Sequence, residues 1–274
     1  MAMVINTNMA SENAVRLLDQ TSRSQKVSME RLTSGLRINH TADDAAGKAV
    51  VTRMDSQVKG TDMAIRNAQD GISLVQTIDG AVEEAVNMLQ RIRELAVQAA
   101  NDTYTSAQRY DMQMEVSQLK IEINRIAQTT KFNGTSLLNG SNTKMSFHVG
   151  WETAAVNEIS VSMYNLSTGN NSYGTAVVST QAKALSAIAK MDIDISNLNK
   201  MRAKWGAAQN RFEHTVANLQ NVNENIKAAR SQIQDADFAR ESANLARTQV
   251  LQQAGMAMLS QANQNSQQVL SLLR

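Results

Sequence analysis

The chain has 274 residues, carries a net charge of +2 from 27 basic and 25 acidic side chains, and contains no proline and no cysteine. The absence of cysteine excludes disulfides and thiolate chemistry, and the balanced, dispersed charge leaves no basic stripe for nucleic acid. Average usage would give roughly 14 prolines, so their absence favours long uninterrupted helices, and the aromatic content of only 4% argues against a thick globular core.

The N-terminal segment has no pattern of a secretory leader. Residues 1–8 lack the basic segment and the apolar core of a signal peptide. No stretch of the chain approaches the roughly 18 consecutive apolar residues of a membrane span, so we expect no membrane insertion. If the protein is exported, we expect a route that needs no cleaved signal peptide. Apolar residues at helical spacing then predict a helix from Ser11 to Leu36.

The first long helix is predicted by apolar residues that recur three and four positions apart from Met54 to Ala100. This coiled-coil pattern predicts a helix over residues 44–100, roughly 85 Å long at about 1.5 Å per residue. Asp43 and Asp44 stand just before it. We interpret both as caps that satisfy the free amides of the helix, rather than as catalytic carboxylates.

The middle of the chain follows a different pattern. After a shorter predicted helix over residues 112–126, apolar and polar residues alternate over 144–150 and again over 157–163. Such alternation is typical of half-buried strands, and it predicts a β-hairpin near 144–163. A polar loop is expected over 166–173.

A second long coiled-coil pattern runs from Ile188 to Ile233. A helix over residues 181–273, if unbroken, would be roughly 140 Å long, whereas a globule of this chain length has a radius of gyration of only about 19 Å. We therefore expect a mainly α fold, an elongated antiparallel coiled-coil rod with a small hairpin region. Four seam positions are polar and either set the helix register or reach solvent at the seam's edge: Arg202, Gln209, Asn223 and Arg230.

Each of the helices at the two ends of the chain has only a narrow apolar stripe. Packing the two helices together as one hairpin would not bury these stripes. A pair of them would expose an apolar stripe, which marks an interaction surface, and head-to-tail contacts that close no ring give an open helical polymer. The pattern therefore predicts a filament or sheath subunit. The candidate self-assembly residues on these arms are Val15, Leu18, Leu32, Leu36, Leu245, Leu251, Leu259, Val269 and Leu273.

No constellation in the sequence indicates catalysis. His40, His148 and His214 are far apart and lack metal-ligand spacing. Asp237 and Glu241 share a helical face, and we interpret them as a solvated edge. We expect no enzymatic activity, no cofactor and no metal.

Several segments resemble bacterial flagellins. The resemblance covers about residues 1–140 and 180–274, and the N-terminal signature departs from the family only in having Thr33 where serine is usual. The matching blocks are ERLTSGLRIN at 30–39, ADDAAG at 42–47, LQRIRELAVQ at 89–98, GAAQNRF at 206–212 and VLSLLR at 269–274.

This resemblance implies a two-domain plan. Residues 1–42 and 231–274 would form an inner assembly domain of terminal helices, and residues 43–230 a helical rod domain. The short segment after the hairpin implies a minimal flagellin without large outer domains. The implied function is that of a structural subunit of the extracellular flagellar filament used for motility, exported unfolded through the flagellar type III apparatus.

The resemblance also implies partners. The main expected partners are other flagellin copies, which form a helical homopolymer. A secretion chaperone, a cap protein and a hook–filament junction protein are also expected. Some flagellins are recognised by the vertebrate receptor TLR5, and the residues that match the recognised surface are Arg91, Leu95 and Glu115. We interpret these three as structural first, because in related filaments this surface lies between subunits.

The polar loop offers modification sites. Asn165-Leu166-Ser167 and Asn170-Asn171-Ser172 fit the N-glycosylation sequon. Surface regions of many flagellins are O-glycosylated instead, for which the candidates here are Ser167, Thr168 and Ser172. A solvated, unmodified loop is the alternative.

Two other functions compete with the filament subunit. A hook–filament junction protein shares the terminal arms, but such proteins match the LQRIRELAVQ and VLSLLR blocks less well. A coiled-coil signalling or binding module would form a stable dimer and no long polymers.

Overall fold

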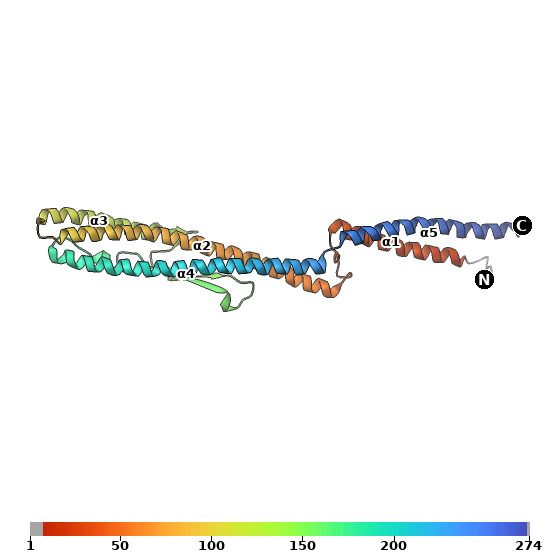
Figure 1. Cartoon of the computed structure of the whole chain (residues 1–274), viewed down its shortest axis with the longest axis horizontal. Helices are drawn as coiled ribbons and strands as arrows, with labels where there is room; N and C mark the ends of the chain where they lie inside the picture. The colour runs from red at the N-terminus through yellow and green to blue at the C-terminus, as the bar shows by residue number, and fades with distance from the viewer. Residues whose placement is uncertain (1–7, 273–274) are drawn as a thin grey trace. The chain divides into compact units, whose positions relative to one another are not determined.

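The structure is a computed structural model that describes residues 8–272, with side chains described from Asn8 to Gln264. It is mainly α, as the sequence predicts (Figure 1). The described helices are α1 (Met9–Ser34), α2 (Ala45–Ala99), α3 (Ser106–Thr129), α4 (Gln181–Gln234) and α5 (Phe238–Leu272). The short elements are β1 (Lys131–Phe132), β2 (Thr135–Ser136), β3 (Lys144–His148), β4 (Glu158–Ser162) and the 3-10 helices η1 (Ala155–Asn157) and η2 (Ser172–Thr175).

The chain forms two compact units. Unit 1 contains the described residues up to Ser56 together with those from Asn225 onward, and unit 2 contains Gln57–Glu224. Unit 1 therefore holds α1 and α5, and unit 2 holds α3, the hairpin and most of α2 and α4.

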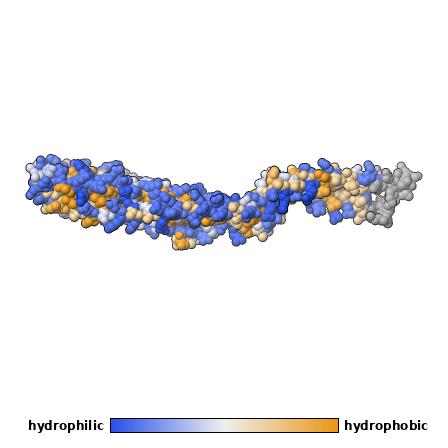
Figure 2. Space-filling view, in the orientation of Figure 1, coloured by the Kyte–Doolittle hydropathy of each residue, from blue (hydrophilic) through white to orange (hydrophobic). Residues whose placement is uncertain are grey.

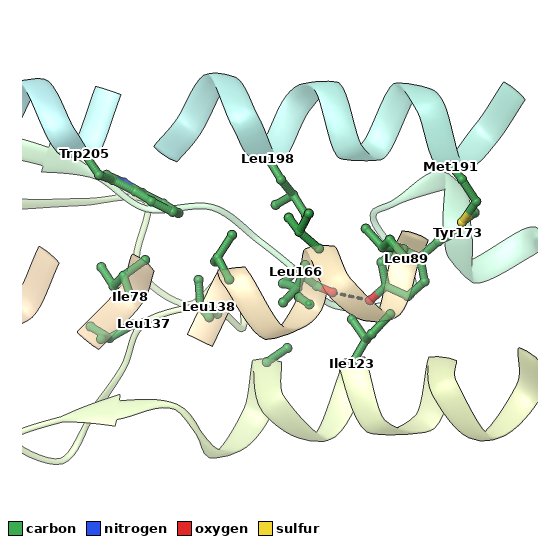
Figure 3. Packing of buried hydrophobic residues seen from close by; sticks show 14 of the residues in the cluster. Ile78, Leu89, Ile123, Leu137, Leu138, Leu166, Tyr173, Met191, Leu198 and Trp205 are labelled. Carbon is green, nitrogen blue, oxygen red and sulfur yellow. Dashed lines mark hydrogen bonds between the residues drawn. The ribbon is translucent and has the colours of Figure 1, made fainter. Parts of the chain in front are cut away.

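The core of unit 2 lies between α2, α3 and α4 (Figure 3). Each helix contributes large apolar side chains, among them Leu89 of α2, Ile123 of α3 and Leu198 of α4, all buried. The segment between α3 and α4 also enters this core, with Leu137, Leu138, Leu166 and Tyr173 fully buried. Three helices and a connecting segment thus share one core.

The segment over 166–173 is not the purely polar loop that the sequence predicts. Tyr173 is buried, and its hydroxyl donates a hydrogen bond to the carbonyl of Leu166 (Figure 3). The Asp194 carboxylate of α4 accepts from the amide of Tyr173 at 2.6 Å and from that of Ser172 at 3.3 Å. Burial and the nearby Asp194 carboxylate raise the pKa of the Tyr173 phenol. The loop is therefore anchored at both of its ends.

The predicted β-hairpin is confirmed. Strands β3 and β4 pair antiparallel, with Met145 opposite Val161 and Phe147 opposite Ile159. Their apolar side chains face the helices, because successive residues of a strand point to opposite faces. The rings of Phe147 and Phe212 meet edge to face with centroids 5.6 Å apart.

Trp205 of α4 packs against the hairpin. Its side chain is buried, and its Nε1 donates to the carbonyl of Ser162 at 2.8 Å. A buried indole needs such an acceptor, because an unpaired N–H away from water costs free energy.

The stretch from residue 181 to residue 272 contains two helices and is not one unbroken helix. Helix α4 ends at Gln234, and α5 begins at Phe238. Leu36 forms a β-bridge with Asp235, and the amide of Arg37 donates to the carbonyl of Gln234 at 2.7 Å. The Asp237 carboxylate then caps α5 by accepting from the amides of Ala239 and Arg240. Backbone pairing with a distant segment and a new N-cap therefore stop the helix.

The ends of the predicted N-terminal helix also shift. Helix α1 ends at Ser34, because Gly35 adopts a left-handed φ of 71° and its amide bonds the carbonyl of Arg31. Leu36 is therefore outside the helix. Of the two predicted caps of α2, Asp44 accepts from the amide of Gly47 at 2.8 Å, whereas Asp43 accepts from the amides before it in the turn and is not a helix cap.

Candidate assembly interface

The helices α1 and α5 pack against each other in antiparallel register (Figure 1). The Asn8 side-chain Nδ2 donates to the carbonyl of Ala262 at 3.1 Å near one end of the pair, and the Ser28 hydroxyl donates to Glu241 at 2.9 Å near the other. Between them, Leu18 lies so close to Gly255 that an added Cβ would be 2.9 Å from its Cδ2. Glycine at 255 thus lets the two helices approach closely.

The seam of the α1–α5 pair is polar and narrow. Within α1, all of whose residues the structure describes, Ser28 alone is buried. The buried residues that α5 contributes are Glu241 and Thr248 among those whose side chains are described. Because apolar burial is the main favourable term in folding, a seam of this composition stabilises the pair weakly.

Large apolar side chains instead lie on the outer surface of the pair (Figure 2). Leu17 is 58% exposed and Met258 is 65% exposed. Both line a groove of about 460 Å³ between α1 and α5, together with Leu18, Leu251 and Gly255. Further exposed apolar residues are Val15, Val27, Met29, Phe238, Val250 and Met256. Exposed apolar surface of this kind is typical of interaction sites.

The candidate assembly residues fall into three groups in the structure. Val15 and Leu251 are exposed, and the second group consists of half-buried residues: Leu18, Leu32, Leu36, Leu245 and Leu259. The side chain of Val269 and the whole of Leu273 lie outside the described residues. Four further exposed apolar residues of the pair were not predicted from the sequence: Leu17, Val250, Met256 and Met258. They could have been found by asking which apolar residues flank the polar seam positions.

Glu241 is not part of a solvated edge. It is 7% exposed, accepts the Ser28 hydrogen bond, and lies 3.8 Å from a guanidinium nitrogen of Arg31. The expectation was wrong because the opposing helix α1 covers this face of α5. A polar groove of about 490 Å³ begins here, also between α1 and α5.

Polar residues of the α4 seam pair across to α2. Arg202 binds Asp79 at 2.7 Å, and Asn223 donates to Asp62. In unit 1, Arg230 pairs with Asp55 in the same way. These contacts connect specific positions of the two helices and favour the register-setting alternative. Gln209 instead bonds Glu213 of its own helix.

The surface proposed for receptor recognition is only partly exposed. Arg91 on α2 binds Glu115 on α3 at 2.9 Å and Glu94 at 3.1 Å, and all three are open to solvent. Leu95 is 3% exposed. It belongs to the core between the helices, so its side chain is not available to a partner of the folded subunit.

The candidate glycosylation residues belong to the anchored loop. Ser167, Thr168 and Ser172 are half-buried. The Ser172 amide is held by Asp194, and the Asn171 side chain bonds the carbonyls of Asn165 and Ser167.

The described part of the chain contains no candidate metal-binding cluster. No three His, Asp or Glu side chains among these residues are grouped closely enough to hold a metal ion. No helix within residues 8–272 combines the length and the apolar character needed to cross a membrane.

Long paired helices, a small hairpin and an apolar surface on the terminal helices define a subunit built for assembly. Two family models match the chain: the bacterial flagellin N-terminal helical region over residues 5–143 and the bacterial flagellin C-terminal helical region over 188–273. The chain belongs to the bacterial flagellin family. Its members are structural subunits of the flagellar filament that serves motility, and this chain is such a subunit.

Curated relatives align over nearly the whole chain. A flagellin of Halalkalibacterium halodurans is 42% identical over 272 residues, covering 99% of this chain and 100% of the relative. The flagellin FlaB2 of Treponema pallidum is 42% identical over 286 residues with the same coverage. Among solved structures, a Bacillus cereus flagellin matches with a TM-score of 0.50 and 33% identity, over 56% of this chain and 88% of that one.

A structure described as a putative flagellar hook-associated protein from Vibrio parahaemolyticus shares the fold. Its TM-score is 0.60, it covers 70% of this chain and 100% of its own, and its sequence identity is 12%.

Proposed function

We propose that the α1–α5 pair is the assembly device by which copies of this chain polymerise into the flagellar filament. The observation that carries the proposal is the apolar groove on this pair, where Leu17 and Met258 stay largely exposed although the helices are packed together. A weak polar seam with an apolar exterior is suited to a segment whose stability comes from neighbouring copies.

This proposal assigns the inner assembly domain to residues 1–42 and 231–274 and the surrounding rod domain to 43–230. Helix α1 and all of α5 fall within the first set. Residues 144–187, which contain the hairpin, the later part of the connecting segment and the first turns of α4, lie between the regions matched by the two family models. The small size of this segment supports a minimal flagellin that adds no large outer domain to the filament.

Seeded polymerisation tests the assembly role. Purified full-length chain is mixed with short filament fragments and followed by light scattering and negative-stain microscopy. We expect growth by the full chain and none by a variant truncated after Asp237, which lacks α5. Leu17→Asp should also block growth, because it places a charge in the groove, while Gln20→Asp, on an exposed position of the same helix, should not.

A chain that stays monomeric or forms small coiled-coil oligomers beside good seeds would contradict the proposal. The binding-module alternative would then be preferred. Growth of the truncated variant at the rate of the full chain would move the assembly device from α5 to the rod domain.

We also propose the remaining partners that membership of the family implies. A secretion chaperone would cover the exposed apolar residues of α5 before export through the type III apparatus, and a cap protein and a junction protein would contact the growing and basal ends. The Arg91–Glu115 surface would contact neighbouring subunits, and recognition by TLR5 would use the same surface without the Leu95 side chain. Glycosylation at Ser167, Thr168 or Ser172 would require the anchored loop to open. The proposal includes no enzymatic activity.

A further inference from the structure

A polar groove beside the apolar one on the α1–α5 pair carries an excess of positive charge. Three arginines line it, Arg23 and Arg31 from α1 and Arg247 from α5, against the one carboxylate of Glu241. The Arg23 guanidinium also forms an ion pair with Asp19 at 2.8 Å. Arg247 has no ion-pair partner among the described residues. The groove therefore has more donors than its own acceptors can satisfy.

The buried end of this groove lacks an acceptor. Glu241 is already bonded to Ser28, and its distance of 3.8 Å from Arg31 is too long for a hydrogen bond. The Nε atom of Arg31 is buried and has no hydrogen-bond partner. An unsatisfied buried donor is costly, and a carboxylate fits the planar fork of a guanidinium better than any other protein group. The groove is thus suited to an incoming carboxylate.

One carboxylate of unit 1 is left without a partner. Among the described acidic residues of this unit, Glu12 alone has a side chain with neither a hydrogen bond nor an ion pair. It lies on the exposed surface of α1. The stretch of α5 from Thr248 to Gln264 contains no charged residue that could neutralise it.

Glu12 cannot reach the groove within its own chain. It precedes Arg23 by eleven positions on the same straight helix, which is roughly 16 Å along the helix axis. A second copy of the chain, displaced along the α1–α5 pair, can bring its Glu12 to this level. Eleven residues are close to three full turns of an α-helix, so Glu12 and Arg23 lie on the same side of α1, whereas the α1 residues that line the apolar groove, from Ala10 to Thr21, lie on another side.

We propose that the groove formed by Arg23, Arg31 and Arg247 binds the Glu12 carboxylate of a second copy, and so sets the displacement between neighbouring copies in the polymer. This inference rests on the proposed assembly role of the α1–α5 pair. The apolar groove supplies contact area, and the ion pair selects one register of copies because every other displacement leaves Glu12 without a partner.

Two other roles of Glu12 are separable from this one. As an acidic residue in the first turn, Glu12 interacts favourably with the N-terminal dipole of α1. Arg16 stands four positions later, but its guanidinium bonds the Asn13 side chain. Both roles lie within one chain, so neither depends on the charge of residue 247.

A charge exchange tests the proposal. Glu12→Arg and Arg247→Glu are made singly and together in the full chain, and seeded elongation is measured at several salt concentrations. Each single variant should elongate about tenfold more slowly than the wild type, and the double variant should return to within about threefold of it. Elongation of the wild type should slow as salt rises, and that of Glu12→Gln should depend less on salt.

Matched controls keep the outcomes distinct. Lys26→Glu removes a basic residue of α1 that does not line the groove, and its combination with Glu12→Arg should restore nothing. Circular dichroism of each monomer confirms that its helices are retained. Normal wild-type growth without rescue by Arg247→Glu would overturn the inference and leave the assembly role intact. No growth by the wild type at all would overturn the proposed function itself.

Discussion

The ring of Phe212 on α4 packs directly against Gly71 of α2, and a Cβ atom at residue 71 would lie 2.7 Å from its Cζ. Glycine inside a helix costs about 1 kcal/mol relative to alanine. At this position the cost is offset, because the missing side chain makes room for a buried ring that also packs against Phe147 of the hairpin.

The glycines of α2 therefore differ in what alanine would do. Gly71→Ala overpacks the seam, and we expect a loss of about 1–3 kcal/mol from strain that exceeds or cancels the gain in helix propensity. Gly80→Ala is the matched control, since nothing lies within 4 Å of the position its Cβ would take. It should stabilise unit 2 by up to about 1 kcal/mol. Thermal unfolding followed by circular dichroism measures both, and equal midpoints for the two variants would contradict the packing argument.

The ion pair between Arg202 of α4 and Asp79 of α2 should stabilise the packing of these two helices. Its nitrogen–oxygen distances are 2.7 and 3.2 Å, but both side chains are about one-third exposed. We expect a coupling free energy of about 0.5–1 kcal/mol, since solvent screens such a pair. A double-mutant cycle with Arg202→Ala and Asp79→Ala, read by urea unfolding, measures it. Glu83 at 3.6 Å from Arg202 is replaced by Gln in a parallel cycle to separate its share.

The Asp194 carboxylate should determine how firmly the connecting segment is held. Asp194→Ala leaves the amides of Ser172 and Tyr173 without an acceptor, which we expect to cost about 1–3 kcal/mol. Asp194→Asn keeps one acceptor oxygen and should lose less. Hydrogen exchange is expected to accelerate over residues 166–178 in the alanine variant while α3 stays protected. Uniform acceleration across unit 2 would show instead that Asp194 contributes only to global stability.

The Ser28–Glu241 hydrogen bond should stabilise the α1–α5 pair. Ser28→Ala leaves a buried carboxylate with no hydrogen-bond donor, a loss of about 1–3 kcal/mol. Filaments of this variant are expected to depolymerise at a lower temperature than wild-type filaments. Ser24→Ala, at an exposed serine one turn away, serves as control and should leave the temperature unchanged. An unchanged midpoint for Ser28→Ala would mean that Glu241 finds another donor.

Much of this fold could be predicted from local pattern. The spacing of apolar residues along α2 and α3 and the alternation over the hairpin are periodic, and each period matches one type of secondary structure. The absence of proline likewise leaves these helices free to run for tens of residues. Such features depend on near neighbours in the chain, so the sequence contains them in readable form.

The residues that form the seam of the α1–α5 pair could not be predicted from local periodicity. Periodicity places apolar residues inward, yet Ser28 and Glu241 occupy the seam and Leu17 lies outside it. A hydrophobic pattern cannot show which apolar residues of a helix pack against its partner in the fold and which stay exposed. Leu95 illustrates the converse, because it was predicted to belong to a recognition surface and lies in the core.

The sequence by itself determined that this protein is helical, elongated in its elements and a member of an assembling family, because heptad spacing and long ordered motifs are local properties. Only the tertiary structure decided where α4 stops and α5 starts, which depends on pairing between residues 36–37 and residues 234–235, nearly 200 positions away. The same holds for the burial of Tyr173 and Glu241. Each depends on a partner from a distant segment, and no local pattern specifies that partner.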